Sequence, residues 1–347
     1  MQFAYNLVQV CSNNYPMKIA FFSTQVYDKQ FFIEHNNNHF NLDFFEVSLS
    51  MQTVDLIKNC IAVCVFVNDH INAEVMEALS AKGVKIIALR CAGFNNIDLA
   101  SAKANNIKVC RVPAYSPSSV AEHAVAMIMT LNRKTHKAYN RVREQNFSLL
   151  GLLGFNLVDK QVAVIGTGKI GVAFAKIMHG FGCRVTAFDL FENPELTAMG
   201  IEYKPLLSII KEADIISLHC PLTEQTQHMV NDAFLGQTKS GVMIINTSRG
   251  GLIDTNAAIE GLKSGHIGYL GIDVYEQEEK LFFRDLSAEI ISDDVIQRLM
   301  SFPNVLITAH QAFFTKEAMD QISTITLNNI KELNDNADFN EGGTVLV

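Results

Sequence analysis

Short apolar runs alternate with amphipathic stretches along most of this chain. In its first third, the runs predict strands at residues 18–22, 61–67 and 86–89. The spacing of apolar residues predicts a helix at residues 72–81. The pattern then resumes, with strands predicted at residues 162–165, 185–188, 215–218, 242–246, 268–274 and 305–308. Strands that alternate with helices form parallel sheets, so the chain is predicted to be an α/β protein with two such series.

An almost unbroken helical pattern lies between the two series, at residues 118–147. Its apolar positions are Ala121, Ala124, Val125, Met127, Ile128 and Leu131. This stretch is too apolar for an exposed linker, so we predict a long helix that crosses from the first domain to the second. Its surplus apolar face is expected to pack against another subunit. A second pattern at residues 316–333 predicts a C-terminal helix that can return to the first domain.

A glycine motif opens the second series. The predicted strand ends in Gly166, Thr167, Gly168, Lys169, Ile170 and Gly171, a GxGxxG sequence followed by a helical pattern. Such glycines allow a tight turn, a close approach of the backbone to a pyrophosphate, and close packing of the helix on the sheet. Glycine-rich turns also occur in loops that bind nothing, but here the next strand ends in Asp189, 18 residues after Gly171. A carboxylate at that place accepts hydrogen bonds from a ribose and repels a 2′-phosphate, which predicts NAD rather than NADP.

Composition narrows the possible functions of the 347-residue chain. A net charge of −8 without a block of Lys or Arg argues against nucleic acid as a partner and leaves a small molecule as the expected substrate. Seven cysteines without CxxC pairs fit reduced thiols better than disulfides or a zinc site, and Cys60 and Cys64 are expected in the core. Neither a membrane span nor a signal peptide is apparent. We therefore expect a cytoplasmic protein without a metal.

Three polar residues follow the later strands of the second series: Arg249, Glu278 and His310. Each has an ordinary explanation by itself, as a surface cation, a member of an acidic run, or a buried histidine. Ligands of open α/β sheets, however, gather where strands end. Reduction of a 2-oxo acid requires a cation for the carboxylate and a proton donor for the carbonyl oxygen, with the hydride coming from the cofactor. Arginine suits the first role, and a histidine beside a carboxylate suits the second.

Together these motifs make the chain resemble the D-isomer-specific 2-hydroxyacid dehydrogenase family from about Met17 to near the C-terminus. The resemblance is carried by the glycine motif and by residues 90–98 (RCAGFNNID), 112–117 (VPAYSP), 217–223 (SLHCPLT), 246–250 (NTSRG), 273–278 (DVYEQE) and 310–314 (HQAFF). Residues 280–299 resemble the lactate branch of the family more than its phosphoglycerate branch. Gly251 stands where alanine is common in the family, and residues 1–16 have no counterpart.

The resemblance implies roles for individual residues. Arg249, Glu278 and His310 would be catalytic, the backbone amides near Ala92 and Gly93 would bind the substrate carboxylate, and Tyr115 would contact the substrate. Asp273 would hold the nicotinamide amide. The remaining cofactor cleft would be lined by His219, Cys220, Pro221 and Thr247. Met127 and its neighbours match the family's dimer helix, which implies a homodimer or homotetramer.

The resemblance also implies two doubly wound parallel-sheet domains with a cleft between them. Residues 17–116 and 315–347 would form a flavodoxin-like substrate domain, and residues 117–314 a Rossmann NAD-binding domain. Residues 1–16 would be an extension, read as a loosely held tail. The implied activity is the reversible reduction of pyruvate to D-lactate with NADH. A bulkier 2-oxo acid as substrate remains an alternative, and so does an NAD-sensing corepressor of the same fold, although a basic patch or long tail is lacking.

Overall fold

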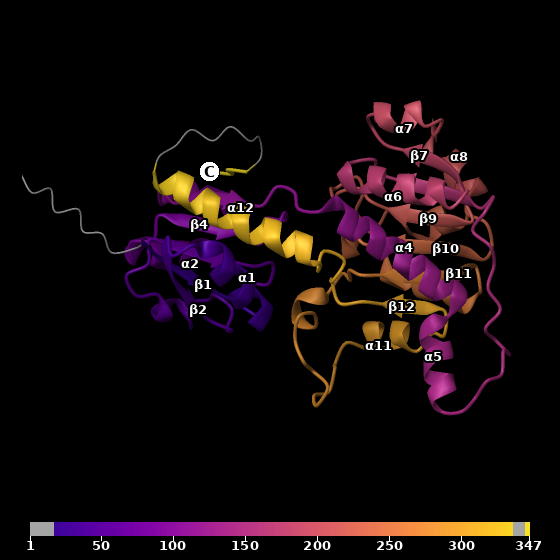
Figure 1. Ribbon diagram of the computed structural model, residues 1–347, viewed down its shortest axis with the longest axis horizontal. Coiled ribbons are helices and arrows are strands. Elements are labelled where there is room, and N and C mark those ends of the chain that lie inside the picture. The colour runs from indigo at the N-terminus through magenta and orange to yellow at the C-terminus, as the bar shows by residue number, and fades with distance from the viewer. Residues whose placement is uncertain (1–16, 336–343) are drawn as a thin grey trace, which may run out of the picture. The chain divides into compact units, whose positions relative to one another are not determined.

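The computed structural model describes residues 17–335 and 344–347, which form two compact units (Figure 1). The first unit comprises the described residues of Met1–Tyr115 and Lys316–Val347, and the second comprises Ser116–Thr315. Each is built on a parallel sheet of its own and is described by itself. The extension expected at residues 1–16 lies outside the described residues.

The first unit contains a five-stranded sheet in the order β2-β1-β3-β4-β5. All its pairings are parallel, and the strand order is that of flavodoxin-like folds. The strands are β1 (Met17–Phe21), β2 (Phe40–Phe44), β3 (Ala62–Val65), β4 (Ile86–Leu89) and β5 (Lys108–Arg111). The predictions at 18–22, 61–67 and 86–89 are confirmed. The prediction missed β2 and β5, the two outermost strands, because polar residues interrupt their apolar pattern.

Helices flank this sheet. They are α1 (Val26–Asn36), α2 (Ala73–Ala81), α3 (Leu99–Ala104) and α12 (Lys316–Asn334), with the 3-10 turn η1 (Val54–Leu56). The predicted helix at 72–81 is α2, which is capped by Asn72 through a 3.0 Å bond from the Val75 N–H. The helix predicted at 316–333 is α12, which packs against α1 in the first unit. Residues 344–347 hydrogen-bond to β5 and cover that sheet edge.

The second unit contains a seven-stranded parallel sheet in the order β12-β11-β10-β9-β6-β7-β8. Its strands are β6 (Gln161–Ile165), β7 (Arg184–Phe188), β8 (Glu202–Tyr203), β9 (Ile215–Leu218), β10 (Val242–Asn246), β11 (Ile267–Ile272) and β12 (Val305–Ile307). All six predicted strands are confirmed, and the two-residue β8 was missed. The chain runs from β6 outward to β8 and then returns to β9 on the other side of β6. The sheet therefore changes direction between β6 and β9, where dinucleotides bind in such folds.

The helices of the second unit cover both faces of its sheet. They are α4 (Pro117–Arg133), α5 (Thr135–Arg143), α6 (Lys169–Gly180), α7 (Pro194–Ala198), α8 (Leu206–Glu212), α9 (Asp232–Leu235), α10 (Thr255–Lys263) and α11 (Asp294–Met300), with the 3-10 turns η2 (Gly250–Leu252) and η3 (Glu278–Lys280). One apolar core lies between the sheet and α4 and α6, and the other includes residues of α8, α9, α10 and α11. Both faces are thus buried, as expected for a parallel sheet.

The prediction of one long helix at 118–147 is wrong. Lys134 adopts a left-handed backbone with φ 51°, which closes α4 and starts α5 in a new direction. The helix does not cross between domains, because the second unit already begins at Ser116. Its apolar face is not surplus either: Met127 is 2% exposed and packs in the core of its own unit. The exposed large apolar residues of the 118–147 stretch are Tyr139, Val142 and Phe147, in α5 and after it.

Cysteine burial agrees with the prediction. Cys60 and Cys64 are 3% and 0% exposed, and the six cysteines within the described ranges carry free thiols. Among residues 17–335 and 344–347, no three or more His, Cys, Asp or Glu side chains form a group that could hold a metal ion. No helix in these ranges is both long enough and apolar enough to cross a membrane.

Candidate active site

His310 and Glu278, the histidine and carboxylate predicted to act together, are in hydrogen-bonding contact. His310 follows β12 and Glu278 begins η3 after β11, so adjacent parallel strands bring them to one edge of the sheet. Nδ1 of His310 lies 2.7 Å from Oε1 of Glu278, and the two side chains are 20% and 21% exposed. The other Glu278 oxygen accepts the backbone N–H of Tyr275 at 2.9 Å. The carboxylate is therefore held in place and fixes the orientation of the imidazole ring.

Arg249 lies at the end of β10, the next strand of the same sheet. The turn that carries it is held by the side chain of Asn246, which donates to the Arg249 carbonyl at 2.8 Å and accepts the Ser248 N–H at 3.0 Å. The guanidinium donates to the Ser248 carbonyl at 2.6 Å, and the side chain is partly exposed. Three neighbouring strands thus place a cation, a carboxylate and an imidazole at their carboxyl ends, along one edge of the sheet.

Asp273 directly follows β11, is buried, and forms hydrogen bonds to other residues of the protein. It is 0% exposed, and its carboxylate accepts hydrogen bonds from Thr308, Gln311 and Ala312. Burial raises the pKa of Asp273, but these hydrogen bonds and one from His123 outweigh it and lower the pKa below its usual value. The carboxylate is therefore ionised. Sequence reasoning missed His123 and Thr308, because a single polar residue in an apolar helix or strand gives no separate signal.

The three glycines of the motif differ in their surroundings: Gly166 and Gly171 lie close to neighbouring backbone, whereas Gly168 borders open space. Gly166 has φ 94°, and a Cβ there would lie 2.6 Å from the Cys220 nitrogen. A Cβ on Gly171 would lie 1.9 Å from the Gly166 oxygen, whereas one on Gly168 would meet nothing within 4 Å. Gly168 precedes α6 without a side-chain cap. Lys169 and Ile170 open that helix, and its first amides lack a side-chain cap, as expected for a pyrophosphate site.

Asp189 stands at the end of β7 and reaches back to the glycine turn. Its Oδ2 accepts the Thr167 N–H at 2.5 Å and the Thr167 hydroxyl at 3.2 Å, and its Oδ1 accepts the Leu190 N–H at 2.6 Å. Burial raises the pKa of Asp189, but the hydrogen bonds outweigh it and lower the pKa. The Thr167 hydroxyl also accepts from Tyr203 at 2.9 Å. The carboxylate is thus ionised and held beside the glycine motif.

Two buried polar atoms, one in a residue after β9 and one in a residue after β10, lack a protein partner among the described residues. His219 and Cys220 follow β9, and Pro221 comes next. The backbone N–H of His219 donates to the Ile165 carbonyl at 2.7 Å. Burial lowers the pKa of His219 to about 3, so its ring is neutral. In the described part of the chain, Nδ1 of His219 and Oγ1 of Thr247 are buried without a hydrogen-bond partner. Buried polar groups are normally satisfied, so these atoms suit a polar ligand.

The predicted substrate contacts Ala92, Gly93 and Tyr115 belong to the first unit. The Ala92 carbonyl accepts from the Arg111 guanidinium at 2.7 Å, and the Gly93 carbonyl accepts from the Cys91 thiol at 3.3 Å. Both carbonyls are engaged, which orients the turn after β4. Tyr115 is the last residue of this part of the unit and is partly exposed.

Residues 125–312 match the family model described as "D-isomer specific 2-hydroxyacid dehydrogenase, NAD binding domain". This match covers more than half of the chain. The chain belongs to the D-isomer-specific 2-hydroxyacid dehydrogenase family. Its members bind NAD through the domain that corresponds to the second unit, so this protein is an NAD-dependent oxidoreductase.

Members of the family match nearly the whole chain. D-lactate dehydrogenase of Escherichia coli is 53% identical over 318 residues, which are 91% of this chain and 97% of that protein. The apo structure of the Escherichia coli enzyme superposes with a TM-score of 0.88 at 49% identity, covering 95% of this chain and 100% of the other. A pyruvate reductase of Chlamydomonas reinhardtii superposes with a TM-score of 0.90 at 43% identity, covering 94% and 98%.

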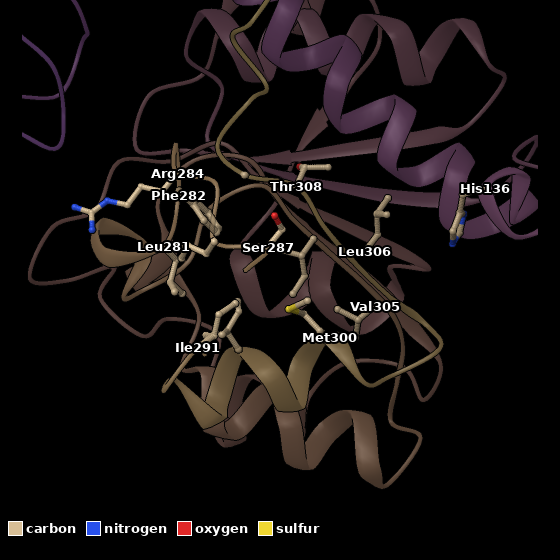
Figure 2. Close-up of a pocket in the computed structure, with 14 residues that line it drawn as sticks. His136, Leu281, Phe282, Arg284, Ser287, Ile291, Met300, Val305, Leu306 and Thr308 are labelled. Atoms are coloured by element: carbon tan, nitrogen blue, oxygen red, sulfur yellow. The ribbon is translucent and has the colours of Figure 1, made fainter. Parts of the chain in front are cut away.

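A separate apolar pocket lies beside the catalytic candidates of this family member (Figure 2). It has a volume of about 550 Å³ and is lined mainly by residues of β12, of α11 and of the segment after η3, among them Phe282, Ile291 and Met300. Figure 2 shows Arg284 extending away from the other labelled side chains. Arg249, Glu278 and His310 do not line this pocket, so we do not assign it to the substrate.

Proposed function

We propose that this protein is an NAD-dependent D-lactate dehydrogenase that reversibly reduces pyruvate to D-lactate. The observation that carries the proposal is the 2.7 Å contact between His310 and Glu278 at the sheet edge that also holds Arg249. The 53% identity to a D-lactate dehydrogenase over 91% of the chain supports the choice of substrate.

Each of the three side chains has a proposed role. The Arg249 guanidinium binds the carboxylate of pyruvate through two parallel hydrogen bonds and polarises the neighbouring carbonyl. Because Nδ1 of His310 contacts Glu278, Nε2 is the ring nitrogen that donates a proton to the carbonyl oxygen. Glu278 fixes the orientation of the ring through its contact with Nδ1. NADH, when bound, supplies the hydride that reduces the carbonyl carbon.

The cofactor is proposed to lie along the glycine turn. Gly166, Thr167, Gly168, Lys169, Ile170 and Gly171 would bind the pyrophosphate, and Asp189 would bind the adenosine ribose. His219, Cys220, Pro221, Thr247 and Asp273 remain proposed as the rest of the cofactor cleft. In the first unit, Ala92, Gly93 and Tyr115 remain proposed substrate contacts, and that unit remains the proposed substrate domain.

A turnover assay tests the proposed function. We expect oxidation of NADH with pyruvate, a D-lactate product on chiral analysis, and a kcat/KM for pyruvate above that for 2-oxoisocaproate. A higher value for 2-oxoisocaproate would replace pyruvate with the bulkier substrate. NADH binding without turnover of either acid would instead favour the corepressor. The free thiols are in keeping with the proposed cytoplasmic location.

Cofactor preference gives a first prediction. Asp189→Ala should lower the ratio of kcat/KM for NADH to that for NADPH by about 10- to 100-fold, because hydrogen bonds to a charged group contribute about 1.5–3 kcal/mol. Steady-state kinetics with both cofactors measure the ratio. The exposed neighbour Glu192 offers a control, and Glu192→Ala should leave the ratio unchanged. An unaltered ratio in Asp189→Ala would remove Asp189 from the ribose site.

A second prediction concerns the proposed homo-oligomer. Leu149, Leu150 and Leu153 are 81%, 83% and 88% exposed in the segment that follows α5. Exposed apolar side chains gathered on one segment mark an interaction surface. The pocket of Figure 2 is also bordered by α5, through His136. We propose that a second copy of the chain covers this surface by a two-fold contact, in place of the α4 face expected from the sequence.

Three leucine-to-aspartate substitutions test this surface. The triple variant Leu149→Asp, Leu150→Asp and Leu153→Asp should sediment as a monomer in analytical ultracentrifugation, whereas the unmodified chain sediments as a dimer or tetramer. Leu207→Asp, on α8, replaces another exposed leucine and should leave the oligomer intact. A triple variant that keeps the oligomeric state would move the interface elsewhere.

A further inference from the structure

The backbone that carries His310 adopts a conformation that its surroundings must hold. His310 has φ 52°, in the left-handed region that residues with a side chain rarely adopt. Such a conformation persists only where neighbouring groups enforce it. The position of the proposed proton donor therefore depends on what anchors residues 308–312.

Asp273 is that anchor, with four hydrogen bonds to this five-residue segment. Its backbone carbonyl accepts the His310 N–H at 2.7 Å. Its Oδ1 accepts the Thr308 hydroxyl at 2.5 Å and the Gln311 N–H at 2.9 Å, and its Oδ2 accepts the Ala312 N–H at 2.9 Å. These hydrogen bonds fix the backbone on both sides of His310. The anchor is a buried carboxylate, which needs compensating donors or charge to stay in place.

His123 approaches this anchor from α4. Its Nε2 lies 3.1 Å from the Thr308 hydroxyl oxygen and 3.5 Å from Oδ1 of Asp273, and its side chain is 17% exposed. Because the Thr308 hydroxyl donates its proton to Asp273, its oxygen accepts from Nε2 of His123. The neighbouring α4 residues Ala124 and Met127 are buried in the core, so the helix holds His123 firmly.

We propose that His123 is a positioning residue for the reduction. By donating to the Thr308–Asp273 cluster, it holds the strained segment that presents His310 to the substrate. The mechanism rests on the proposed catalytic role of His310. It predicts that His123 affects the chemical step rather than substrate affinity, since a displacement of about 1 Å at the reacting groups can cost about 100-fold in rate.

Two substitutions of His123 separate positioning from packing. His123→Leu removes the donor and keeps an apolar side chain, whereas His123→Gln keeps an N–H that can reach Thr308. We expect His123→Leu to lower kcat by about 10- to 100-fold with KM for pyruvate within about twofold, and His123→Gln to restore most of the loss. NADH affinity, measured by fluorescence titration, should not change. His179→Leu, at an exposed site on α6, is the control and should match the unmodified protein.

Thr308→Val tests the same cluster if His123→Leu does not fold. It removes the hydroxyl that links His123 to Asp273, at nearly constant volume, and should also lower kcat with little change in KM. A normal kcat in a folded His123→Leu or Thr308→Val would overturn the proposal. So would an equal loss in His123→Leu and His123→Gln, because a donor at this position would then be irrelevant.

A spectroscopic measurement keeps this test independent of the proposed function. The ring signals of His310 in ¹H–¹⁵N spectra of the cofactor-free protein report its contact with Glu278. We expect them to shift or broaden in His123→Leu and to stay near their original positions in His123→Gln. If the protein does not reduce pyruvate, the proposed function fails, yet shifted His310 signals would still support positioning. Unmoved signals in His123→Leu would overturn positioning whatever the activity.

Discussion

His310→Ala should lower kcat/KM for pyruvate by about 10²- to 10⁴-fold, the range that general acid catalysis contributes. The substitution removes the proposed proton donor after β12. The glycine turn that would bind NADH follows β6 and is left intact. Steady-state kinetics and fluorescence titration of NADH together measure the effect. We expect nearly unchanged NADH affinity.

A second histidine–carboxylate pair supplies the control. His228 lies 2.6 Å from Glu276 in the same unit, so His228→Ala removes the same kind of contact away from the proposed donor, and turnover should persist. Normal turnover in His310→Ala would show that another residue transfers the proton.

Arg249→Lys should lower kcat/KM for pyruvate by about two orders of magnitude, because the positive charge is kept but the planar fork is lost. An ammonium group cannot bind a carboxylate through two parallel hydrogen bonds from a fixed plane. The loss should appear in both kcat and KM, since the guanidinium is proposed to hold the substrate and to polarise its carbonyl. Kinetics with pyruvate at saturating NADH measure it.

Arg284→Lys is the matched control for this substitution. Arg284 is exposed and lines the apolar pocket rather than the proposed substrate site, so its replacement should leave kcat/KM unchanged. If Arg249→Lys retained nearly full activity with normal NADH binding, Arg249 would have only a structural role at the end of β10. The substrate carboxylate would then need another cation.

The sheets and the residues at their edge were largely predictable from the sequence. Short continuous apolar runs such as Val242–Asn246 are typical of buried strands, and a polar residue after such a run is expected at the carboxyl end of the strand. This reasoning located Arg249, Glu278 and His310 and the contact between the last two. It failed for β2, β5 and β8, because edge strands and a two-residue strand need little apolar pattern to pair.

Local pattern by itself therefore determined the α/β class, the glycine turn with Asp189, and the three candidate catalytic residues, because each depends on neighbours in sequence. Tertiary structure decided the rest. The left-handed turn at Lys134 divides a helical pattern that looks continuous, and the α4 face that looks unpartnered is covered by α6 and the sheet of its own unit. His123 meets Asp273 and Thr308 only after α4 has packed on that sheet, since 185 residues separate His123 from Thr308. Contacts at such separations arise from packing, and no local pattern encodes them.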